Sequence, residues 1–256
     1  MSQAMQLVGL QDFPLVEPGD DLAQLLKSSL QANDLALEDG DVLVLAQKIV
    51  SKAEGRYVRL STVEPGPEAL ELAAASDKDP RQAELILRES KTVLRRRPGV
   101  VIVEHKLGYV HANAGIDKSN LPTNEEDPAV LLLPEDSDGS AEVLRQALQQ
   151  HYQCTRLGLI INDSAGRAWR MGTVGMAIGT AGIEPLRNQV GEPDLFGRSL
   201  EVTEVAVADE LAAAASFVMG QAAEGCPVVL IRGAQWSAAE VGSSALLRNP
   251  AQDMFR

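Results

Sequence analysis

Apolar residues recur along the chain with two spacings, and these separate predicted helices from predicted strands. A helix capped by Asp20 or Asp21 is predicted by the three- and four-residue spacing of Leu22, Leu25, Leu26 and Leu30. Short unbroken apolar runs instead predict buried strands at residues 42–45, 100–103, 157–161 and 228–231. Helices and strands therefore both contribute to the predicted core.

Proline and glycine mark the limits of further predicted elements. We expect helices over residues 67–76, from Pro80 to just before Pro98 with Leu85 and Val93 facing the core, from Asp138 to Tyr152, and through residues 211–215 to Gly220. Glycines at 172, 175, 179 and 182 predict close backbone packing. Strands and helices alternate irregularly, so we predict an α+β fold, with mixed sheets and packed helices in two tightly joined lobes.

Composition narrows the class of protein. The 256 residues, 45% of them hydrophobic, suit a single domain over residues 1–256. No N-terminal leader is visible and no apolar run approaches the roughly 20 residues of a membrane helix, so we expect a cytoplasmic chain without a membrane partner. Cys154 and Cys226 are interpreted as reduced thiols.

A formal net charge of −13 and only 4% aromatic residues make nucleic acid a poor partner. The exception is the basic run at residues 95–97, which we interpret as the solvated end of the helix predicted from Pro80. The polar stretch at residues 123–127 is interpreted as a surface loop.

The strongest local signal lies at residues 113–120, where small residues and a glycine precede Asp117 and are followed by Ser119 and Asn120. Carboxylate and amide oxygens placed closely on a loop suit a hard cation such as Mg²⁺ or Mn²⁺. The alternative is an Asx-turn, in which Asp117 or Asn120 bonds only its own backbone.

A second signal follows the apolar run that ends at Ile161. There the strand should deliver Asp163 and Ser164 to its C-terminal end, where open sheets commonly place ligand-binding residues. An aspartate beside a hydroxyl is a good pair for Mg²⁺; the alternative is a capping turn. A third signal is Gln47, Lys48 and Lys52 after the strand at 42–45, where lysines either meet a nucleotide phosphate or form a solvated face.

Familiar motifs are missing from the sequence. No segment fits the P-loop pattern, the dinucleotide fingerprint or the nucleophile elbow. His105, His111 and His151 lack zinc-ligand spacing, and His111 is interpreted as an ordinary, partly buried histidine. Hydrolase-type nucleophilic catalysis therefore has no support from the sequence.

Taken in order, several motifs resemble one family, the ligases that add L-glutamate to the deazaflavin precursor of coenzyme F420 with GTP. They cover nearly the whole chain, and they lie at residues 18–22, 51–56, 113–117 with Asn120, 163–167, 172–179, 194–198, 207–210 and 228–233. The resemblance implies a GTP-dependent amide-bond former: the γ-phosphate passes to the acceptor's terminal carboxylate, and the glutamate amine displaces phosphate from the resulting acyl phosphate.

The resemblance also implies roles for individual residues. Asp117, Asp163 and Ser164 match metal-binding positions, and Asp117, Asp163 and Lys52 are the residues we expect to be catalytic. Nucleotide-binding positions are matched by Phe13, Pro14, Leu15, Val16, Gln47, Lys48, Lys52, Asn120, Met219, Gly220, Gln221, Ala222, Ala223, Glu224, Gly225 and Cys226. The metal is Mg²⁺ or Mn²⁺, and a need for K⁺ stays open.

Some positions depart from the family pattern. Gln47 and Lys48 replace a Ser/Thr-type pair, and Gln221 stands where relatives have an acidic residue, which puts a third metal contact there in doubt. Some relatives carry a C-terminal reductase-like domain, which we do not expect here, and members are typically intertwined homodimers. Two alternatives to the ligase stay open, a metal-dependent nucleotide phosphohydrolase on the same scaffold and a non-catalytic protein that binds GTP and metal.

Overall fold

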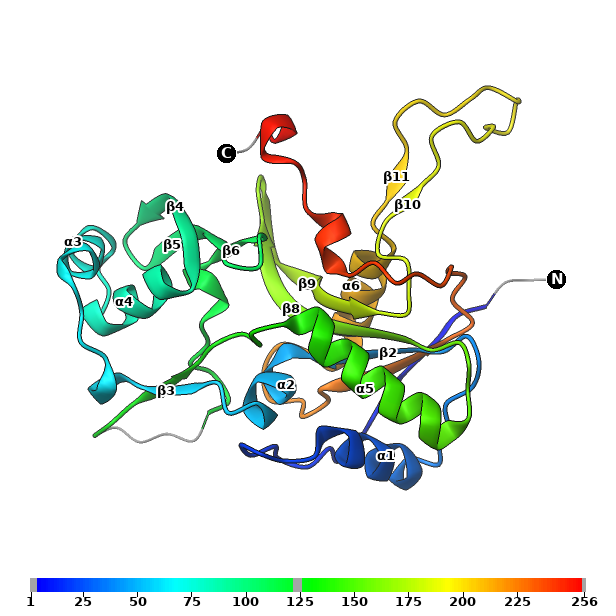
Figure 1. The fold of residues 1–256 in the computed structure, drawn as a ribbon, viewed down its shortest axis with the longest axis horizontal. Helices are drawn as coiled ribbons and strands as arrows, with labels where there is room; N and C mark the ends of the chain where they lie inside the picture. Colours follow the sequence, from blue (N-terminus) through cyan, green and yellow to red (C-terminus); the bar gives the residue numbers. More distant parts are fainter. Residues whose placement is uncertain (1–3, 122–125, 255–256) are drawn as a thin grey trace.

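The computed structural model describes residues 4–121 and 126–254 and has the α+β fold that the sequence predicts (Figure 1). The polar stretch expected to be a surface loop falls largely on residues 122–125, outside the described residues. The helices are α1 (Leu22–Ala32), α2 (Gln47–Ala53), α3 (Pro67–Ser76), α4 (Pro80–Arg88), α5 (Ser137–Tyr152) and α6 (Val207–Met219). No helix in the described ranges is long and apolar enough to cross a membrane.

A five-stranded mixed sheet forms the centre of the molecule. Its order is β1-β12-β2-β8-β9, with only β2 and β8 running parallel. The strands are β1 (Gln6–Gly9), β2 (Val42–Ala46), β8 (Gly158–Arg167), β9 (Arg170–Ala181) and β12 (Val228–Arg232). Except for Leu157, the four apolar runs predicted as strands lie in β-strands, and three of them lie in this sheet.

Side chains alternate between the two faces of the central sheet, as the strand geometry requires. Leu43 and Leu45 pack with α1, α2 and α5, whereas Val42 and Val44 pack with α6 on the other face. Both faces are therefore covered, which explains why β2 reads as an unbroken apolar run. Figure 1 shows α5 and α1 on one side of the sheet and α6 on the other.

A second sheet carries the segments that lead to the candidate site. It consists of β4 (Ser90–Arg97), β5 (Val100–His105) and β6 (Val110–Ala112), and it packs against α3 and α4 through Val101 and Val103. A separate pair, β3 (Tyr57–Arg59) and β7 (Ala129–Leu131), connects this region to the central sheet.

The helix predicted from Pro80 to before Pro98 is wrong in its second half. Helix α4 ends at Arg88, and the basic run lies in strand β4, where Arg95 pairs with Ile102 and Arg97 with Val100. Glu89 caps the helix, and from Ser90 onward the chain gains its hydrogen bonds from β5 instead. Tertiary pairing has thus overridden the helical propensity of the arginines.

The glycine-rich strand β9 and the residue that follows it pack as closely as predicted at three positions. A Cβ on Gly175 would lie 2.4 Å from the Ala212 carbonyl of α6, and one on Gly179 would lie 2.5 Å from the Ser137 carbonyl of α5. Gly182 approaches the Leu157 carbonyl in the same way. The prediction is wrong for Gly172, around which nothing lies within 4 Å. Glycine is needed where helices from both sides touch the strand.

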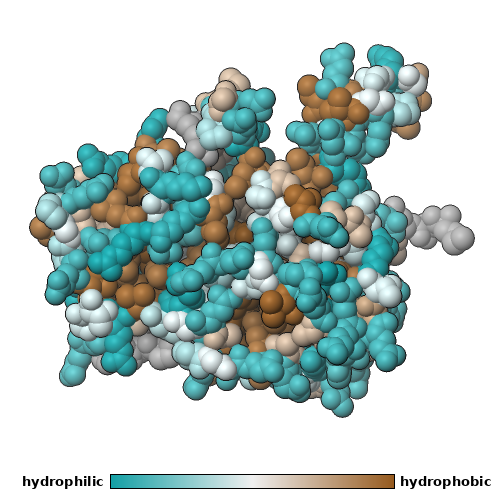
Figure 2. Space-filling model, viewed as in Figure 1, coloured by the Kyte–Doolittle hydropathy of each residue, from teal (hydrophilic) through white to brown (hydrophobic). Residues whose placement is uncertain are grey.

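After β9 the chain forms an arm that projects from the rest of the molecule (Figure 1). Its base is the two-stranded pair β10 (Arg187–Asn188) and β11 (Glu204–Val205). Apolar side chains on the arm are almost fully exposed, namely Leu195, Phe196 and Val202, and hydrophobic colouring is visible on it in Figure 2.

Candidate functional site

The loop after β6 holds Asp117 in a defined orientation. Asn113, Ala114 and Gly115 all have positive φ, and a Cβ on Gly115 would lie 2.5 Å from Leu133. Asp117 then bridges to Leu131, and its Oδ1 accepts hydrogen bonds from the backbone N–H and hydroxyl of Ser119, at 2.7 and 2.9 Å. The Asx-turn proposed as the alternative is therefore present, and it leaves Oδ2 for another partner.

That partner is a lysine from α2. The Nζ of Lys48 lies 2.5 Å from Oδ2 of Asp117. Burial raises the pKa of Asp117, but hydrogen bonds from Lys48 and Ser119 lower it by more than burial raises it. The pKa of Asp117 therefore lies below its ordinary value, and the carboxylate is charged at neutral pH.

The second lysine of α2 lies one helical turn further along, on the same face. Nζ of Lys52 donates to the carbonyl oxygen of Asn120 at 2.8 Å. Burial and the neighbouring charge of Lys48 lower the pKa of Lys52, and Asp117 partly offsets them. Two cations thus face the loop that carries Asp117, which disfavours the interpretation of these lysines as a merely solvated face.

The segment after α6 joins the same set of contacts. Nδ2 of Asn120 donates to the Ala222 carbonyl at 3.2 Å, and the hydroxyl of Ser164 donates to Oε1 of Gln221 at 2.7 Å. Gln221 in turn donates from Nε2 to Ser216 at 2.9 Å. A continuous series of contacts therefore runs from Lys52 through Asn120 and residues 221–222 to Ser164.

Asp163 lies within β8 and not beyond its end. The prediction that the strand stops before Asp163 is wrong, because β8 pairs with β9 as far as Arg167. The register shifts between Ile161 and Asn162, an irregularity of the kind that re-aims side chains in a strand. Asp163 and Ser164 are thus held by a hairpin rather than by a capping turn.

His111 was interpreted as an ordinary, partly buried histidine, and the structure shows it buried beside Asp163. It is buried, with 8% of its surface exposed, and its Nε2 lies 3.0 Å from Oδ2 of Asp163. Burial lowers the pKa of His111, but Asp163 and the Ala112 carbonyl raise it more, and the net pKa lies above the ordinary value. The alternation of β6, which turns His111 inward between Val110 and Ala112, is the signal that could have identified it.

A row of rings extends from His111 into the second sheet. Tyr109 meets His111 edge-on at 6.3 Å and stacks on His105 at 5.0 Å. The Tyr109 hydroxyl is buried and makes no hydrogen bond with the described residues. Burial raises the pKa of Tyr109, and the carboxylates of Asp163, Glu89 and Asp138 raise it further, so the hydroxyl stays protonated and is a free donor.

The remaining residues that the resemblance implies for the nucleotide are positioned mostly by the core. Phe13 and Val16 pack in the cluster that contains Ile49 and Val50 of α2, whereas Leu15 is 90% exposed. Gln47 is buried and accepts from the Ser51 hydroxyl at 2.9 Å. The side chains of Met219 and Cys226 are buried in the α6 cluster.

Between those last two side chains the chain turns sharply. Gly220 has a positive φ, and Oε2 of Glu224 accepts from the backbone N–H of Ala222 at 2.7 Å. Residues 221–225 are exposed, including Ala223 and Gly225. This segment therefore presents its backbone groups and the side chains of Gln221 and Glu224, whereas the side chains of Met219 and Cys226 are buried.

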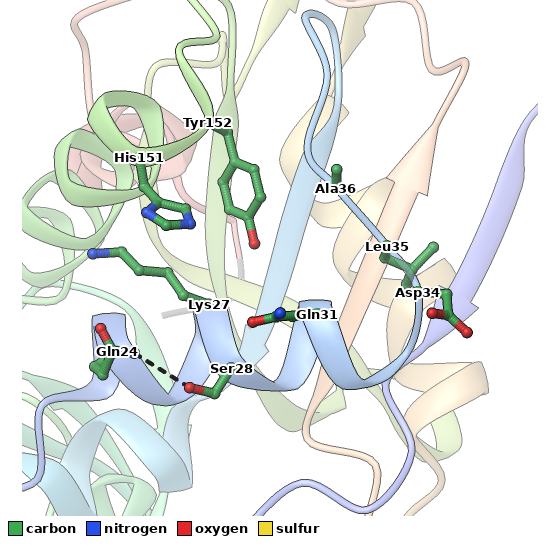
Figure 3. Close-up of a pocket in the computed structure, with 9 residues that line it drawn as sticks. All are labelled: Gln24, Lys27, Ser28, Gln31, Asp34, Leu35, Ala36, His151 and Tyr152. Carbon is green, nitrogen blue, oxygen red and sulfur yellow. Dashed lines mark hydrogen bonds between the residues drawn. The ribbon is translucent and has the colours of Figure 1, made fainter.

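Two hollows of similar size lie outside this set of contacts. One, of about 600 Å³, lies between α1 and the end of α5, where Lys27, His151 and Tyr152 face it (Figure 3). The other, of about 620 Å³, lies beside His111, between the second sheet, the β8–β9 hairpin and the C-terminal segment. Only the second hollow adjoins a candidate site residue, through the pair of His111 and Asp163.

The residues implied for the metal carry oxygen donors, which Mg²⁺ and Mn²⁺ prefer. The Ser164 hydroxyl lies 2.7 Å from the Gln221 amide oxygen, whereas the carboxylates of Asp117 and Asp163 are paired with Lys48 and His111. No group of three or more His, Cys, Asp or Glu side chains that could hold a metal occurs in the described part of the chain. An ion held there would thus depend on substrate oxygens as well, as is usual for Mg²⁺ at phosphates.

Comparison with known proteins gives a consistent family. The family model described as F420-0:Gamma-glutamyl ligase matches residues 11–233. Coenzyme F420:L-glutamate ligase of Methanothermobacter thermautotrophicus is 47% identical over 254 residues, covering 98% of this chain and 99% of that protein. The proteins of the same name from Methanopyrus kandleri and Archaeoglobus fulgidus are 44% and 40% identical, covering 94% and 98% of this chain and 93% and 96% of their own lengths.

The ordered motifs and the comparisons agree, so the resemblance seen in the sequence is confirmed. The match reaches from the N-terminal segment before α1 to the end of β12 and includes every candidate site residue. The chain therefore belongs to the F420-0:Gamma-glutamyl ligase family, and it is a ligase.

Proposed function

We propose that this chain uses GTP to join L-glutamate in amide linkage to the deazaflavin precursor of coenzyme F420, and then adds a further γ-linked glutamate. The observation that carries the proposal is the series of contacts that ties Lys48 and Lys52 of α2, Asp117 and Asn120, Ser164, and residues 221–222 into one site. Four segments, distant in sequence, supply the cations, carboxylates and backbone groups that phosphoryl transfer needs.

The nucleotide phosphates have natural partners in this arrangement. Lys48 and Lys52 are point charges suited to phosphate oxygens, and the exposed turn at residues 221–225 offers backbone N–H groups. Residues 13–16 lie over the same cluster as α2 and complete the proposed wrapping of the nucleotide. The choice of guanine comes from the family resemblance alone.

Asp117, Asp163 and Ser164 are the proposed holders of Mg²⁺ or Mn²⁺, with Gln221 within hydrogen-bond reach of Ser164. When bound, the metal supplies positive charge that stabilises the phosphoryl oxygens. Lys48, which neutralises Asp117 in this structure, is then available to a phosphate oxygen. A need for K⁺ is not indicated by any contact among the described residues.

The reaction balances in two steps. An oxygen of the acceptor carboxylate attacks the γ-phosphorus of GTP, and the bond from this phosphorus to the β,γ-bridging oxygen breaks. The products of this step are GDP and an acyl phosphate. The glutamate amine, having lost a proton, then attacks the acyl carbon and expels inorganic phosphate, which forms the amide. This chain's residues hold the reacting oxygens in line and offset their charge, which is the main contribution in phosphoryl transfer.

Mass spectrometry of the acceptor after incubation with GTP, Mn²⁺ and L-glutamate tests the proposal. We expect a mass gain of one or more glutamate units, and phosphate release that requires both acceptor and glutamate. Phosphate release from GTP alone would instead identify a nucleotide phosphohydrolase. If GTP and metal leave the melting temperature unchanged, the chain binds neither, since a ligand that binds only the native state raises stability.

We also propose that the chain forms an intertwined homodimer built from single-domain, two-lobed protomers that act in the cytoplasm. The projecting arm supports the dimer, because Leu195 and Phe196 are 99% and 83% exposed. Large apolar side chains gathered on an exposed arm are typical of a surface that is covered by a partner. The separate clusters around the central and second sheets support the two lobes.

A further inference from the structure

The hollow beside His111 has the size of a small-molecule site. Its volume is about 620 Å³, within the range of about 300–1,000 Å³ typical of ligand pockets. Residues of β4, β5, β6 and the loop before β6 form one wall, the β8–β9 hairpin forms a second, and Ser243, residues 246–248 and Asp253 form the third. Three segments far apart in sequence thus enclose one space.

One end of this hollow adjoins the proposed phosphoryl-transfer site. His111 lines the hollow and lies 3.0 Å from Asp163, which is next to Ser164 in β8. None of the lysines of α2 and none of residues 219–226 line it. The hollow is therefore next to the site proposed for the nucleotide and is separate from it, as a second substrate requires.

The walls combine apolar surface with a free donor. Ile102, Leu107, Met176, Leu246 and Leu247 line the hollow. Tyr109 also lines the hollow, and only 8% of its surface is exposed. Its hydroxyl is without a hydrogen-bond partner among the described residues. A buried donor left unsatisfied costs free energy, and a bound ligand with an acceptor atom would remove that cost.

Two arginines line the hollow, one from β4 and one from the β8–β9 hairpin. Arg95 of β4 shares a cross-strand row with Ile102, and Arg167 lies at the end of β8. Within the described residues both donate to backbone carbonyls, Arg95 to Leu94 and Arg167 to Met171 and Gly172. Guanidinium groups stack on flat aromatic rings and bind anions, so their place here is unusual on a chain of net charge −13.

We infer that this hollow is the acceptor site, in which the flat deazaflavin ring system lies between the apolar wall and the guanidinium groups of Arg95 and Arg167, and the reacting carboxylate lies at the His111 end. The inference rests on the proposed function, because the deazaflavin precursor is the acceptor of that proposed reaction. It assigns acceptor binding to residues that the nucleotide does not contact. Asp209 also lines the hollow, and its carboxylate accepts from the Ala177 N–H at 2.9 Å.

The experiment compares two double variants. The pocket variant is Arg95→Ala with Arg167→Ala; the matched control is Arg96→Ala with Arg170→Ala. Arg96 is next to Arg95 but pairs with Val101, whose side chain packs toward α3 and α4, and Arg170 faces Arg167 across the hairpin without lining the hollow. All four arginines are exposed, so both variants should fold.

Equilibrium binding of the deazaflavin precursor, followed by its own fluorescence without nucleotide, is the main readout. We expect its dissociation constant to rise about tenfold or more in the pocket variant, the effect of losing one or two charge-assisted contacts. The control should bind it as the wild type does. The KM for GTP should be the same in all three proteins.

Two results would overturn the inference: unchanged acceptor binding in the pocket variant, or an equal loss in the control. Glutamate addition by the wild type, measured by mass spectrometry on the same preparation, tests the proposed function separately. Wild-type ligation with unchanged acceptor binding in the pocket variant removes the acceptor site alone. Weakened acceptor binding without any ligation by the wild type removes the proposed reaction and keeps the site.

Discussion

Lys48 and Asp117 form an ion pair, with Nζ 2.5 Å from Oδ2, and this pair joins α2 to the loop after β6. The other oxygen of Asp117 is occupied by Ser119. One residue therefore serves two purposes: its turn shapes the loop, and its outer oxygen faces a cation. A divalent ion could take that oxygen only if Lys48 moves, and a nucleotide phosphate would give Lys48 a new partner.

Replacing Asp117 with Asn should remove activity while leaving the fold intact. The amide keeps the size of the carboxylate and an oxygen for the Ser119 bonds, but it loses the charge that holds Lys48 and the proposed metal. We expect kcat to fall by a factor of about 100 or more, as when a group that stabilises transition-state charge is lost. Far-UV circular dichroism should be unchanged. The control is Glu71→Gln, which removes the same charge from the exposed side of α3. Normal turnover of Asp117→Asn would contradict the assignment of Asp117 to the metal.

Replacing Lys52 with Ala should weaken nucleotide binding. Lys52 holds the Asn120 carbonyl, and its ammonium is partly desolvated beside Lys48. We expect the GTP dissociation constant, measured by calorimetry, to rise about tenfold, which corresponds to about 1.4 kcal/mol. Lys27→Ala on α1, remote from the site, should not change it. An unchanged constant in Lys52→Ala would leave Lys52 as a structural tie of the loop.

Stability should fall in mild acid because of His105. Burial, and then the positive charges of His111, Lys106, Arg56 and Lys91, lower its pKa from 6.5 to about 4. Glu89 lies 3.9 Å from Nε2, but Arg56 and Lys106 already engage both of its oxygens. The folded state thus binds fewer protons than the unfolded state between these two pH values. The contribution of neutral His105 to the free energy of unfolding is therefore complete above about pH 6.5. It is lost as the pH falls toward 4, by about 3 kcal/mol in total.

Urea unfolding of His105→Asn at pH 7 and at pH 5 checks this sign. Asn keeps an acceptor for the Leu107 N–H, which bonds Nδ1 of His105 at 3.1 Å, but it does not titrate. The variant should therefore lose less stability between the two pH values than the wild type. His151→Asn on the exposed end of α5 serves as the control. Equal losses in wild type and His105→Asn would show that other groups govern the acid response.

Local pattern was enough to predict most of the fold, and it failed where pairing decided the structure. Helix α3 begins and ends where Pro67 and the alanine-rich run place it, and Asp21 is the cap of α1. Residues 90–97 were assigned to a helix that begins at Pro80 and ends before Pro98, but β5 lies beside them and pairs with them. No local signal reveals a partner strand whose position depends on the whole fold.

The candidate site shows the same limit. The two aspartates and the lysines were proposed as site residues because each follows an apolar run or a glycine-containing turn. The contacts that join them, such as Ser164 with Gln221 and Asn120 with Ala222, span 57 and 102 positions of sequence. The contact of His111 with Asp163 was likewise outside local pattern, because the two residues are 52 positions apart in sequence.

Gly175→Ala should destabilise the fold through a clash with α6. A Cβ there would lie 2.4 Å from the Ala212 carbonyl and 2.6 Å from Oδ1 of Asn162, and backbone atoms cannot easily move away. We expect a loss of about 1–3 kcal/mol, typical of overpacking, and a fall in melting temperature of roughly 2–4 °C for each kcal/mol. Gly166→Ala on the same hairpin, with nothing within 4 Å, should be neutral. Equal melting temperatures for both variants would mean that α6 does not pack on β9 in this way.

The arm should control association of the chain. Leu195→Ser with Phe196→Ser removes two apolar side chains that are 99% and 83% exposed in the single chain. If a partner covers them, each contributes about 1.5–3 kcal/mol to association, and the dimer dissociation constant should rise about 100-fold or more in the double variant. Sedimentation velocity over a range of concentrations measures this. Leu70→Ser with Val143→Ser, at exposed apolar positions on α3 and α5, is the matched control and should associate as the wild type does. A monomeric wild type would contradict a role of the arm, since no second copy would then cover its exposed side chains. An equal effect in the control would also contradict it, since association would then not depend on the arm in particular.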